Sequence, residues 1–208
     1  MEKFFFYFFV FYVGSFLGFL LEEGWCFIRH HKFLSRKGLI YEPIIPIYGV
    51  ASLFIFVLAR KVKYQYLAVF LIGMVVATIV EYLSSYLQEV LFHTKSWDYS
   101  NMPFNLHGRV NMLYSIGFGL AAMFFIRFLG KLSRILAKFS SLEMLKTIIV
   151  FLIVFFFVDV FISLIACIRH KHRRENNAKA TFIGMWLDKM YPDERIDKIF
   201  NNAKVISL

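Results

Sequence analysis

The sequence is poor in cysteine and contains none of the short motifs by which many enzymes bind nucleotides or activate a nucleophile. Only Cys26 and Cys167 are cysteines, and we interpret them as small apolar helix residues rather than as a disulfide or redox pair. The sequence has no GxxxxGK[ST] motif, glycine-rich cofactor fingerprint or nucleophile elbow. We therefore expect no ATP or other cofactor on this chain and assign no catalytic residue. An enzymatic activity stays open, although the missing motifs argue against it.

Closely spaced metal ligands are also missing. Neither His-x3-His nor Glu-x-x-His, which would place two ligands on one helix face, occurs in a predicted helix. His30 and His31 are adjacent, so their side chains diverge. We expect no metal site, although His93, His107, Glu81 and Glu89 fall in neighbouring parts of the chain.

Acidic residues are scarce relative to basic ones. The chain has 14 Asp and Glu against 24 Lys and Arg, which gives a formal net charge of +10. The bases gather in predicted loops and in the tail, as in the Arg169 to Arg174 segment. Anionic lipid headgroups are therefore the expected partners. Nucleic acid is not, because no soluble domain with interleaved aromatic residues accompanies the charge.

Apolar residues make up most of the chain. They account for 59% of it, aromatic residues for 20%, and the mean hydropathy is +0.62. A helix needs roughly 20 apolar residues to cross a bilayer, so the long apolar stretches predict an all-α polytopic membrane helix bundle over residues 1–168. The five predicted spans are 4–28, 44–60, 64–92, 110–129 and 145–168. The second is the shortest and begins at the Pro43/Pro46 pair, so a tilted or re-entrant helix is the alternative there.

Residues 169–208 form a basic juxtamembrane segment followed by an amphipathic tail. Phe182, Met185, Trp186 and Met190 recur at helical spacing. A second short helix is predicted after Pro192, since proline suits the first turn of a helix. We expect both helices to lie on the membrane surface, with docking onto a cytoplasmic partner as the alternative.

Five acidic residues fall within the apolar stretches: Glu22, Glu23, Glu81, Glu89 and Asp159. An ionised carboxylate in hydrocarbon costs on the order of 2.5–3.5 kcal/mol, so each must pair, take up a proton or line a polar cavity. Glu22 shares a helix face with two glycines spaced four residues apart, so this face is expected to pack against protein. For Asp159, a paired charge, a proton site and a cation site all remain open.

Arg109 is the nearest candidate counter-ion, because it enters the fourth predicted span on the side where the acids emerge. Its planar guanidinium is expected either to bridge Glu22 or Glu81 or to bind a phosphate or carboxylate ligand. The loop over residues 36–49 carries two prolines that keep it extended. Such backbone at membrane depth must be covered by protein or line a cavity. The predicted substrate-binding residues are Glu22, Glu81, Arg109, Asn105, His107, Tyr48, Trp97 and Asp98.

Four motifs together resemble a bacterial family, the putative ABC-transporter type IV proteins. They are Glu22 and Glu23 at the end of the first span, Arg-x-Gly-x-x-Tyr-x-Pro-x-x-Pro-x-Tyr-Gly over residues 36–49, Trp97-Asp98-Tyr99-Ser100, and Asn105 through Arg109. The resemblance covers roughly residues 10–125, and Glu42 stands where the family pattern would have glycine. It implies a small multi-pass permease of the bacterial cytoplasmic membrane. An ABC system also needs an ATPase, so the resemblance implies a separate ATPase subunit, with a homo-oligomer as the other possible assembly.

Three functions are compatible with these features. The first is a transporter or permease-like component in which a polar cavity near one face uses Glu22 and Glu81 to bind a cation or proton and Arg109 to bind an anionic group. The second is an intramembrane enzyme that acts on a lipid headgroup, with Glu22 or Glu81 as acid/base and Arg109 holding phosphate. The third is a non-catalytic membrane scaffold whose charges only stabilise the bundle.

Overall fold

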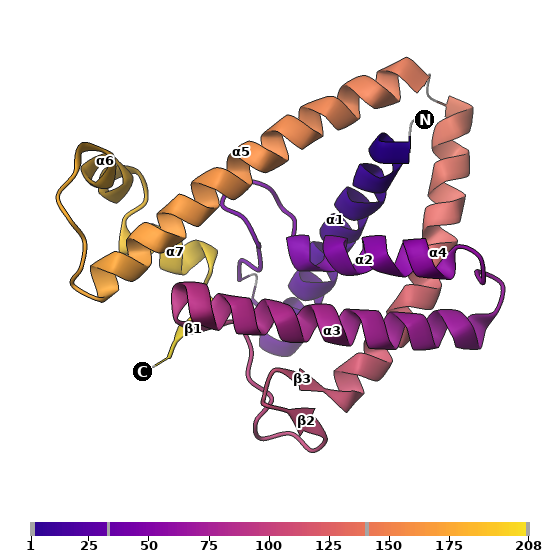
Figure 1. Ribbon diagram of the computed structural model, residues 1–208, viewed down its shortest axis with the longest axis horizontal. Helices are drawn as coiled ribbons and strands as arrows, with labels where there is room; N and C mark the ends of the chain where they lie inside the picture. The colour runs from indigo at the N-terminus through magenta and orange to yellow at the C-terminus, as the bar shows by residue number, and fades with distance from the viewer. Residues whose placement is uncertain (1–2, 33, 140–141, 207–208) are drawn as a thin grey trace.

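The computed structural model describes residues 3–32, 34–139 and 142–206, and this part of the chain is predominantly helical (Figure 1). The helices are α1 Lys3–His30, α2 Pro46–Ala59, α3 Tyr66–Phe92, α4 Met112–Phe139, α5 Leu142–Arg174, α6 Phe182–Met190 and α7 Asp193–Ile199. The strands are β1 Thr94–Lys95, β2 Asn105–Leu106, β3 Val110–Asn111 and β4 Lys204–Val205. The prediction of an all-α membrane bundle with short C-terminal helices is confirmed.

Four of these helices are long and apolar enough to cross a membrane: Lys3–His30, Tyr66–Phe92, Met112–Leu136 and Glu143–Arg174. The predicted second span is shorter than expected, because α2 has only 14 residues. At 1.5 Å per residue it extends roughly 21 Å, less than the roughly 30 Å of a bilayer core. Four of the five predicted spans are therefore long enough to cross a bilayer, and the second, which was predicted to be the shortest, is a short apolar helix. Pro46 starts the helix late, since the residue before a proline is driven out of the α conformation and Ile45 is extended.

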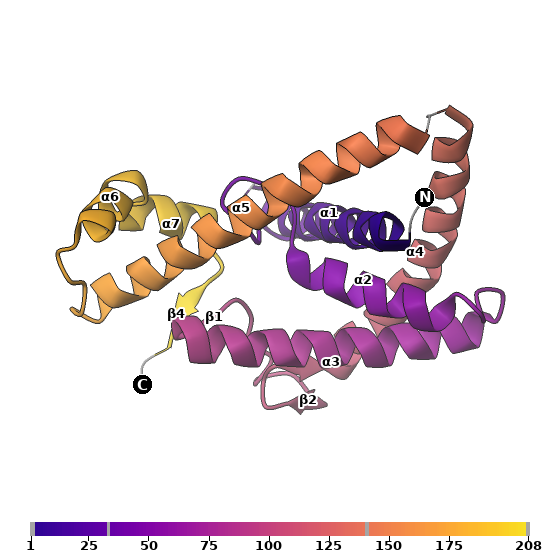
Figure 2. The same ribbon diagram turned by 45° about the horizontal axis from the view of Figure 1, so that its top comes forward.

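Small residues let the first helices pack closely. The face of α1 that carries Gly14 and Gly18 is buried, and a Cβ on either glycine would collide with a side chain of α2. The expectation that this face packs against protein is thus confirmed. In both views α2 and α3 lie side by side (Figures 1 and 2). An apolar core joins α2, α3 and α4 through residues that include Ile55, Val69 and Ala122.

Helix α5 follows α4 and runs back across the bundle to the tail (Figure 2). Aromatic side chains on its outer face are well exposed, such as Phe151 at 69% and Phe161 at 64%, as befits a lipid-facing surface. A second core connects α5 to the loop before α2 and to the tail, through residues that include Ile40, Ala166 and Leu187. The loop and the tail therefore share one face of α5.

The last turns of α5 are tied to the C-terminal end of α3. Lys171 donates to the carbonyl of Leu91 at 3.1 Å, and Arg174 donates to the carbonyl of Phe92 at 2.9 Å. These carbonyls have no partner within their own helix, and cations at a helix C-terminus are favoured by its dipole. His93 ends α3 in the left-handed conformation and contacts Glu175 at 2.8 Å.

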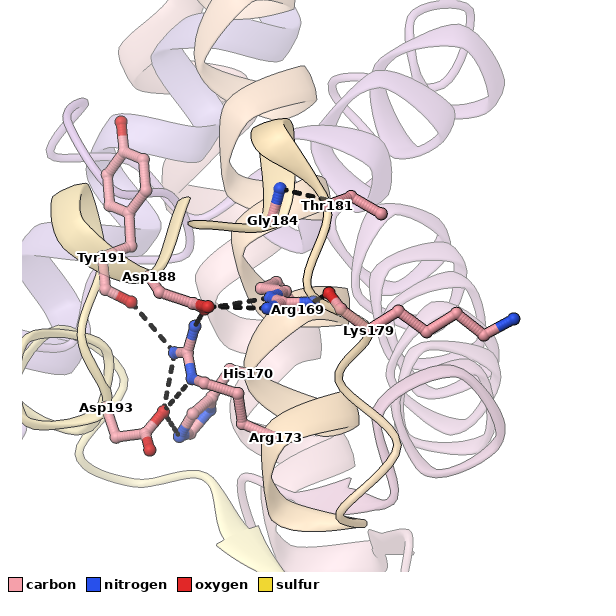
Figure 3. Close-up of polar contacts among 9 residues, drawn as sticks. All are labelled: Arg169, His170, Arg173, Lys179, Thr181, Gly184, Asp188, Tyr191 and Asp193. Atoms are coloured by element: carbon pink, nitrogen blue, oxygen red, sulfur yellow. Dashed lines mark hydrogen bonds and ion pairs between the residues drawn. The ribbon is translucent and has the colours of Figure 1, made fainter. Parts of the chain in front are cut away.

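The tail folds back onto α5 through an ionic cluster (Figure 3). Arg169 donates to both carboxylate oxygens of Asp188, at 2.9 and 2.6 Å, and Arg173 bridges Asp188 and Asp193 at 2.6 Å each. These charge-assisted bonds hold the pKa of the Asp188 carboxyl down at about 2. After α7, strand β4 pairs antiparallel with β1, Thr94 facing Val205, so the tail also contacts the segment that follows α3.

Candidate functional site

Glu22 of α1 accepts a hydrogen bond from the hydroxyl of Tyr48 on α2, with an O–O distance of 2.5 Å. Both side chains are half-buried. The tyrosine reaches the acid because its ring lies over Gly18, one turn before Glu22, where any larger residue would occupy the same space. The pair therefore depends on the close approach of α1 and α2.

Glu81, in the middle of α3, is only 7% exposed. One carboxylate oxygen accepts a hydrogen bond from the Tyr99 hydroxyl at 3.1 Å. The other is buried and has no hydrogen-bond partner among the described residues. Tyr99 lies in the segment between α3 and α4, and its ring stacks on that of Tyr114 with centroids 4.8 Å apart. Burial and the adjacent Glu81 raise the pKa of the Tyr99 hydroxyl above its usual range, so this hydroxyl stays a proton donor.

The two acid–tyrosine pairs are neighbours. Glu22 lies close enough to influence Glu81 and Tyr99 electrostatically, and Tyr48 is likewise influenced by both acids. We refer to Glu22, Tyr48, Glu81 and Tyr99 as the acid–tyrosine cluster. No ion pair between described residues includes either of its carboxylates. Two carboxylates and two tyrosine hydroxyls thus meet where α1, α2 and the hairpin side of α3 approach one another.

Arg109 does not neutralise this cluster. Its guanidinium pairs with Glu89 at 2.6 Å and reaches the Ser85 hydroxyl at 3.4 Å. The rings of Tyr82 and Tyr86 lie 5.9 and 5.4 Å from the guanidinium carbon. The prediction that Arg109 bridges Glu22 or Glu81 is wrong, because Glu89 lies two turns further along α3, near the end from which Arg109 approaches.

The other predicted residues build the segment that carries Tyr99 and Arg109. Asn105 accepts from the amide of Gly108 at 2.9 Å and donates to the carbonyl of Met102 at 2.7 Å. The indole of Trp97 donates to the carbonyl of Arg109 at 2.8 Å. These bonds surround the short β2–β3 hairpin, in which Leu106 faces Val110. We name residues 94–111 the hairpin segment.

Asp98 and His107 belong to the same segment. The carboxylate of Asp98 accepts from the amide and the hydroxyl of Ser100, at 2.9 and 2.5 Å, and these bonds lower the pKa of the half-exposed acid. His107 has a positive φ of 53°, and its Nδ1 lies 2.9 Å from the Tyr82 hydroxyl of α3. Gly108, at a φ of +65°, packs its α-carbon against Ser100 and Asp98, where a side chain would collide.

The structure therefore divides the predicted site into two parts. Glu22, Tyr48 and Glu81 form the acid–tyrosine cluster, whereas the other five residues lie in the hairpin segment. Tyr99 connects the two parts. Its role was missed, although it stands inside the Trp97-Asp98-Tyr99-Ser100 motif, because sequence spacing does not show which way a loop side chain points.

A hollow of about 330 Å³ beside the hairpin is apolar and contains none of the predicted site residues; its lining includes Met102, Phe104 and Met112. No group of three or more His, Cys, Asp or Glu side chains that could hold a metal ion occurs in the part of the chain that the structure describes. The predicted carboxylates Glu22 and Glu81 converge instead in the acid–tyrosine cluster.

The loop before α2 is held by acids of two helices. Glu23 of α1 accepts from the amide of Arg36 at 2.8 Å. Asp159 of α5, which is fully buried, accepts from the amides of Tyr41 and Glu42 at 3.0 and 2.7 Å. The chain bends over residues 38–43, where the amide of Gly38 donates to the carbonyl of Ile44 at 2.9 Å, so it is not extended there as its prolines predicted. Asp159 is thus an anchor for this bent backbone, a fourth role beside those left open from the sequence.

Four long apolar helices, two of which carry carboxylates that accept hydrogen bonds from tyrosines, define a polytopic all-α membrane protein. The family described as Putative ABC-transporter type IV matches residues 9–164, and the chain belongs to this family. The match extends beyond the roughly 10–125 seen from the motifs and includes most of α5 with Asp159. Comparison with curated proteins and comparison with solved structures gave no match.

Proposed function

We propose that this protein is the membrane component of a transporter and that the acid–tyrosine cluster is its polar binding site. The observation that carries the proposal is the convergence of Glu22 from α1 and Glu81 from α3 without a basic partner among the described ion pairs. The family description supports a transport role. Because the sequence contains no GxxxxGK[ST] motif, ATP hydrolysis would come from a separate subunit.

In this proposal the two carboxylates bind a proton or a small cation, and the tyrosines adjust their charge. Tyr48 and Tyr99 each donate one hydrogen bond to one acid, which stabilises its ionised form. The Glu81 oxygen that has no hydrogen-bond partner among the described residues would be available to a bound ion.

The hairpin segment has a positioning role in the proposal. Arg109 and its partner Glu89 fix the segment to the end of α3, while Asn105, His107, Trp97 and Asp98 shape the backbone that presents Tyr99. Binding of an anionic group by Arg109 would require the guanidinium to leave Glu89, so the segment would move when such a group binds.

The test is purification of the protein in nanodiscs, with mass spectrometry of the proteins and small molecules that accompany it. We expect a stoichiometric ATPase, and ATP-driven accumulation of the accompanying small molecule in sealed vesicles. Glu22→Gln and Glu81→Gln should leave the complex assembled but abolish accumulation. Glu143→Gln is the matched control, because this acid is 84% exposed and pairs only with Lys146 among the described ion pairs.

Two results would contradict the proposal. A lipid-linked molecule that returns chemically altered, with no ATPase present, would indicate the headgroup enzyme. Full activity in a well-expressed Glu22→Gln/Glu81→Gln variant would indicate that these acids serve only the packing of the bundle.

A further inference from the structure

A separate acidic side chain, Glu42, is buried between α1 and α5, outside the acid–tyrosine cluster. It is 1% exposed and belongs to the bent segment that precedes α2. One carboxylate oxygen accepts a hydrogen bond from the Tyr12 hydroxyl of α1 at 2.9 Å. The second oxygen, Oε2, is buried and has no hydrogen-bond partner among the described residues.

The nearest acid is Asp159 of α5, and its surroundings suit a negative charge. Its Oδ2 accepts from the amides of Tyr41 and Glu42, and its Oδ1 accepts from the hydroxyl of Ser163 at 3.0 Å. All three hydrogen bonds end on this one carboxyl group. Ser163 in turn accepts from the amide of Ile40 at 2.9 Å, so the whole turn over residues 40–42 rests on this one charged group.

Other titratable groups around Glu42 do not supply a positive charge at its carboxyl. From α1 the facing group is Tyr12, and from α5 it is Asp159. From the tail, the Tyr191 hydroxyl contacts that of Tyr41 at 2.7 Å. Lys37 donates to the carbonyl of Tyr41 at 3.2 Å in an exposed contact. No ion pair between described residues includes Glu42 or Asp159.

An ionised Glu42 would therefore place a second buried charge next to Asp159 with one hydrogen bond to stabilise it. A neutral carboxyl is much easier to bury than a carboxylate. Burial is the main influence that raises the pKa of Glu42, and the charge of Asp159 adds to it, while the hydrogen bond from Tyr12 opposes both.

We propose that Glu42 is a proton-binding site that controls the seating of residues 36–45 against α5. The proton binds Oε2, the oxygen that lacks a partner, while Oε1 keeps its bond from Tyr12. When the proton leaves to solvent, the carboxylate next to Asp159 is repelled, and the turn over residues 40–42 separates from α5. This site is independent of the acid–tyrosine cluster, and its operation does not require the transport function.

Infrared difference spectroscopy tests the proposal directly. The protein in nanodiscs is titrated with pH, and the carbonyl stretch of protonated carboxyl groups is followed. We expect Glu42→Gln to remove one component of this band, whereas Glu143→Gln should leave the band unchanged. The acids of the cluster remain in both variants, so failure here would be distinguishable from failure of the proposed function. An unchanged band in folded Glu42→Gln would overturn the proposal.

Hydrogen exchange of the amides of residues 40–42 gives the second measurement. The exchange rates are first corrected for the intrinsic effect of pH. In the wild type, the corrected rates should rise over the same pH range in which the Glu42 band disappears. In Glu42→Gln, the corrected rates should not depend on pH. Corrected exchange rates that depend equally on pH in the wild type and in Glu42→Gln would contradict the proposed control of the turn. A third measurement adds salt at constant pH. If sodium removes the band and N-methylglucamine does not, the site binds a metal cation rather than a proton, and the proposal is overturned.

Tyr12→Phe keeps the proposal testable if Glu42→Gln fails to fold. This change removes the hydrogen bond that favours the ionised carboxylate, so the midpoint of the Glu42 band should move to higher pH. A midpoint that stays in place or moves to lower pH would contradict the assignment.

Discussion

The ring of Tyr48 occupies the space that a Cβ on Gly18 would need. This contact sets the distance between α1 and α2, and through it the hydrogen bond from Tyr48 to Glu22. A residue without a side chain at position 18 is therefore part of the construction of the acid–tyrosine cluster.

Replacing Gly18 by alanine should destabilise the protein and separate Tyr48 from Glu22. Overpacking of a well-packed contact typically costs about 1–3 kcal/mol. Gly24→Ala is the matched control, because a Cβ built there meets no atom within 4 Å apart from its chain neighbours and the backbone of its own helix. Alanine in an unhindered helix position stabilises by about 0.5–1 kcal/mol. Denaturant unfolding in detergent measures both. Equal stabilities of the two variants would contradict the close contact.

The pair between Arg109 and Glu89 should show strong energetic coupling. Arg109 is 14% exposed, so Glu89→Gln leaves a poorly hydrated cation with its partner removed, and hydrogen bonds to charged groups contribute about 1.5–3 kcal/mol. In a double-mutant cycle with Arg109→Gln, the double variant should be more stable than the sum of the single losses implies. The exposed Lys146–Glu143 pair is the control, with an expected coupling below about 1 kcal/mol. Similar coupling in both cycles would argue against a structural role for Arg109.

Acid should release the tail from α5. The pKa of Asp188 is lowered to about 2 from an ordinary value of 3.8 by the bonds from Arg169 and Arg173. Because the pKa is lower in the docked form, the stabilisation is fully present above about pH 4 and is lost as the pH falls towards 2. Hydrogen exchange of α6 should therefore increase over this range.

Asp188→Asn should release the tail already at neutral pH, since an amide cannot replace the charge that both arginines contact. Asp197→Asn is the control, because Asp197 is 68% exposed and contacts only His170 among the described ion pairs. Protection of α6 that is unaffected by Asp188→Asn would show that its apolar contacts alone hold the tail.

Helix α6 should rest on the lipid headgroups. Its outward residues include Phe182 at 83% and Ile183 at 66% exposure, while Leu187 is buried towards α5. In a variant that keeps only Trp186 as a tryptophan, lipids brominated near the headgroup should quench its fluorescence more than lipids brominated at the chain ends. Phe182→Ser/Ile183→Ser should reduce the quenching. The absence of quenching by either lipid would favour a protein partner for this face.

The lengths of the apolar stretches and the spacing of the small residues predicted the main part of the fold. Continuous apolar stretches specify helices because the backbone must satisfy its own hydrogen bonds in lipid, and the Gly14 and Gly18 spacing indicated the face that packs on α2. The length of α2 was harder to predict, since the apolar run continues through residues 44 and 45 although the backbone there is not helical. A hydrophobicity profile does not show that Pro46 sets the first residue of the helix.

The partners of the charged groups could not be predicted in the same way. Arg109 lies between several acids in sequence, and only the packing of the hairpin segment on α3 selects Glu89. Asp159 binds the amide of Glu42 across 117 positions in the chain. Backbone amides carry no residue-specific signal, so the sequence could show that Asp159 needed donors but not where they would come from.

The contacts of Lys171 and Arg174 with the last carbonyls of α3 have a mechanical consequence. They fasten two helices that each carry a buried acid, Glu81 on α3 and Asp159 on α5. If one of these helices tilts, the other must move with it, or the hydrogen bonds from Lys171 and Arg174 must break. If an ion at Glu81 displaced α3, as the proposed function allows, the displacement would therefore reach α5 through this end of the two helices.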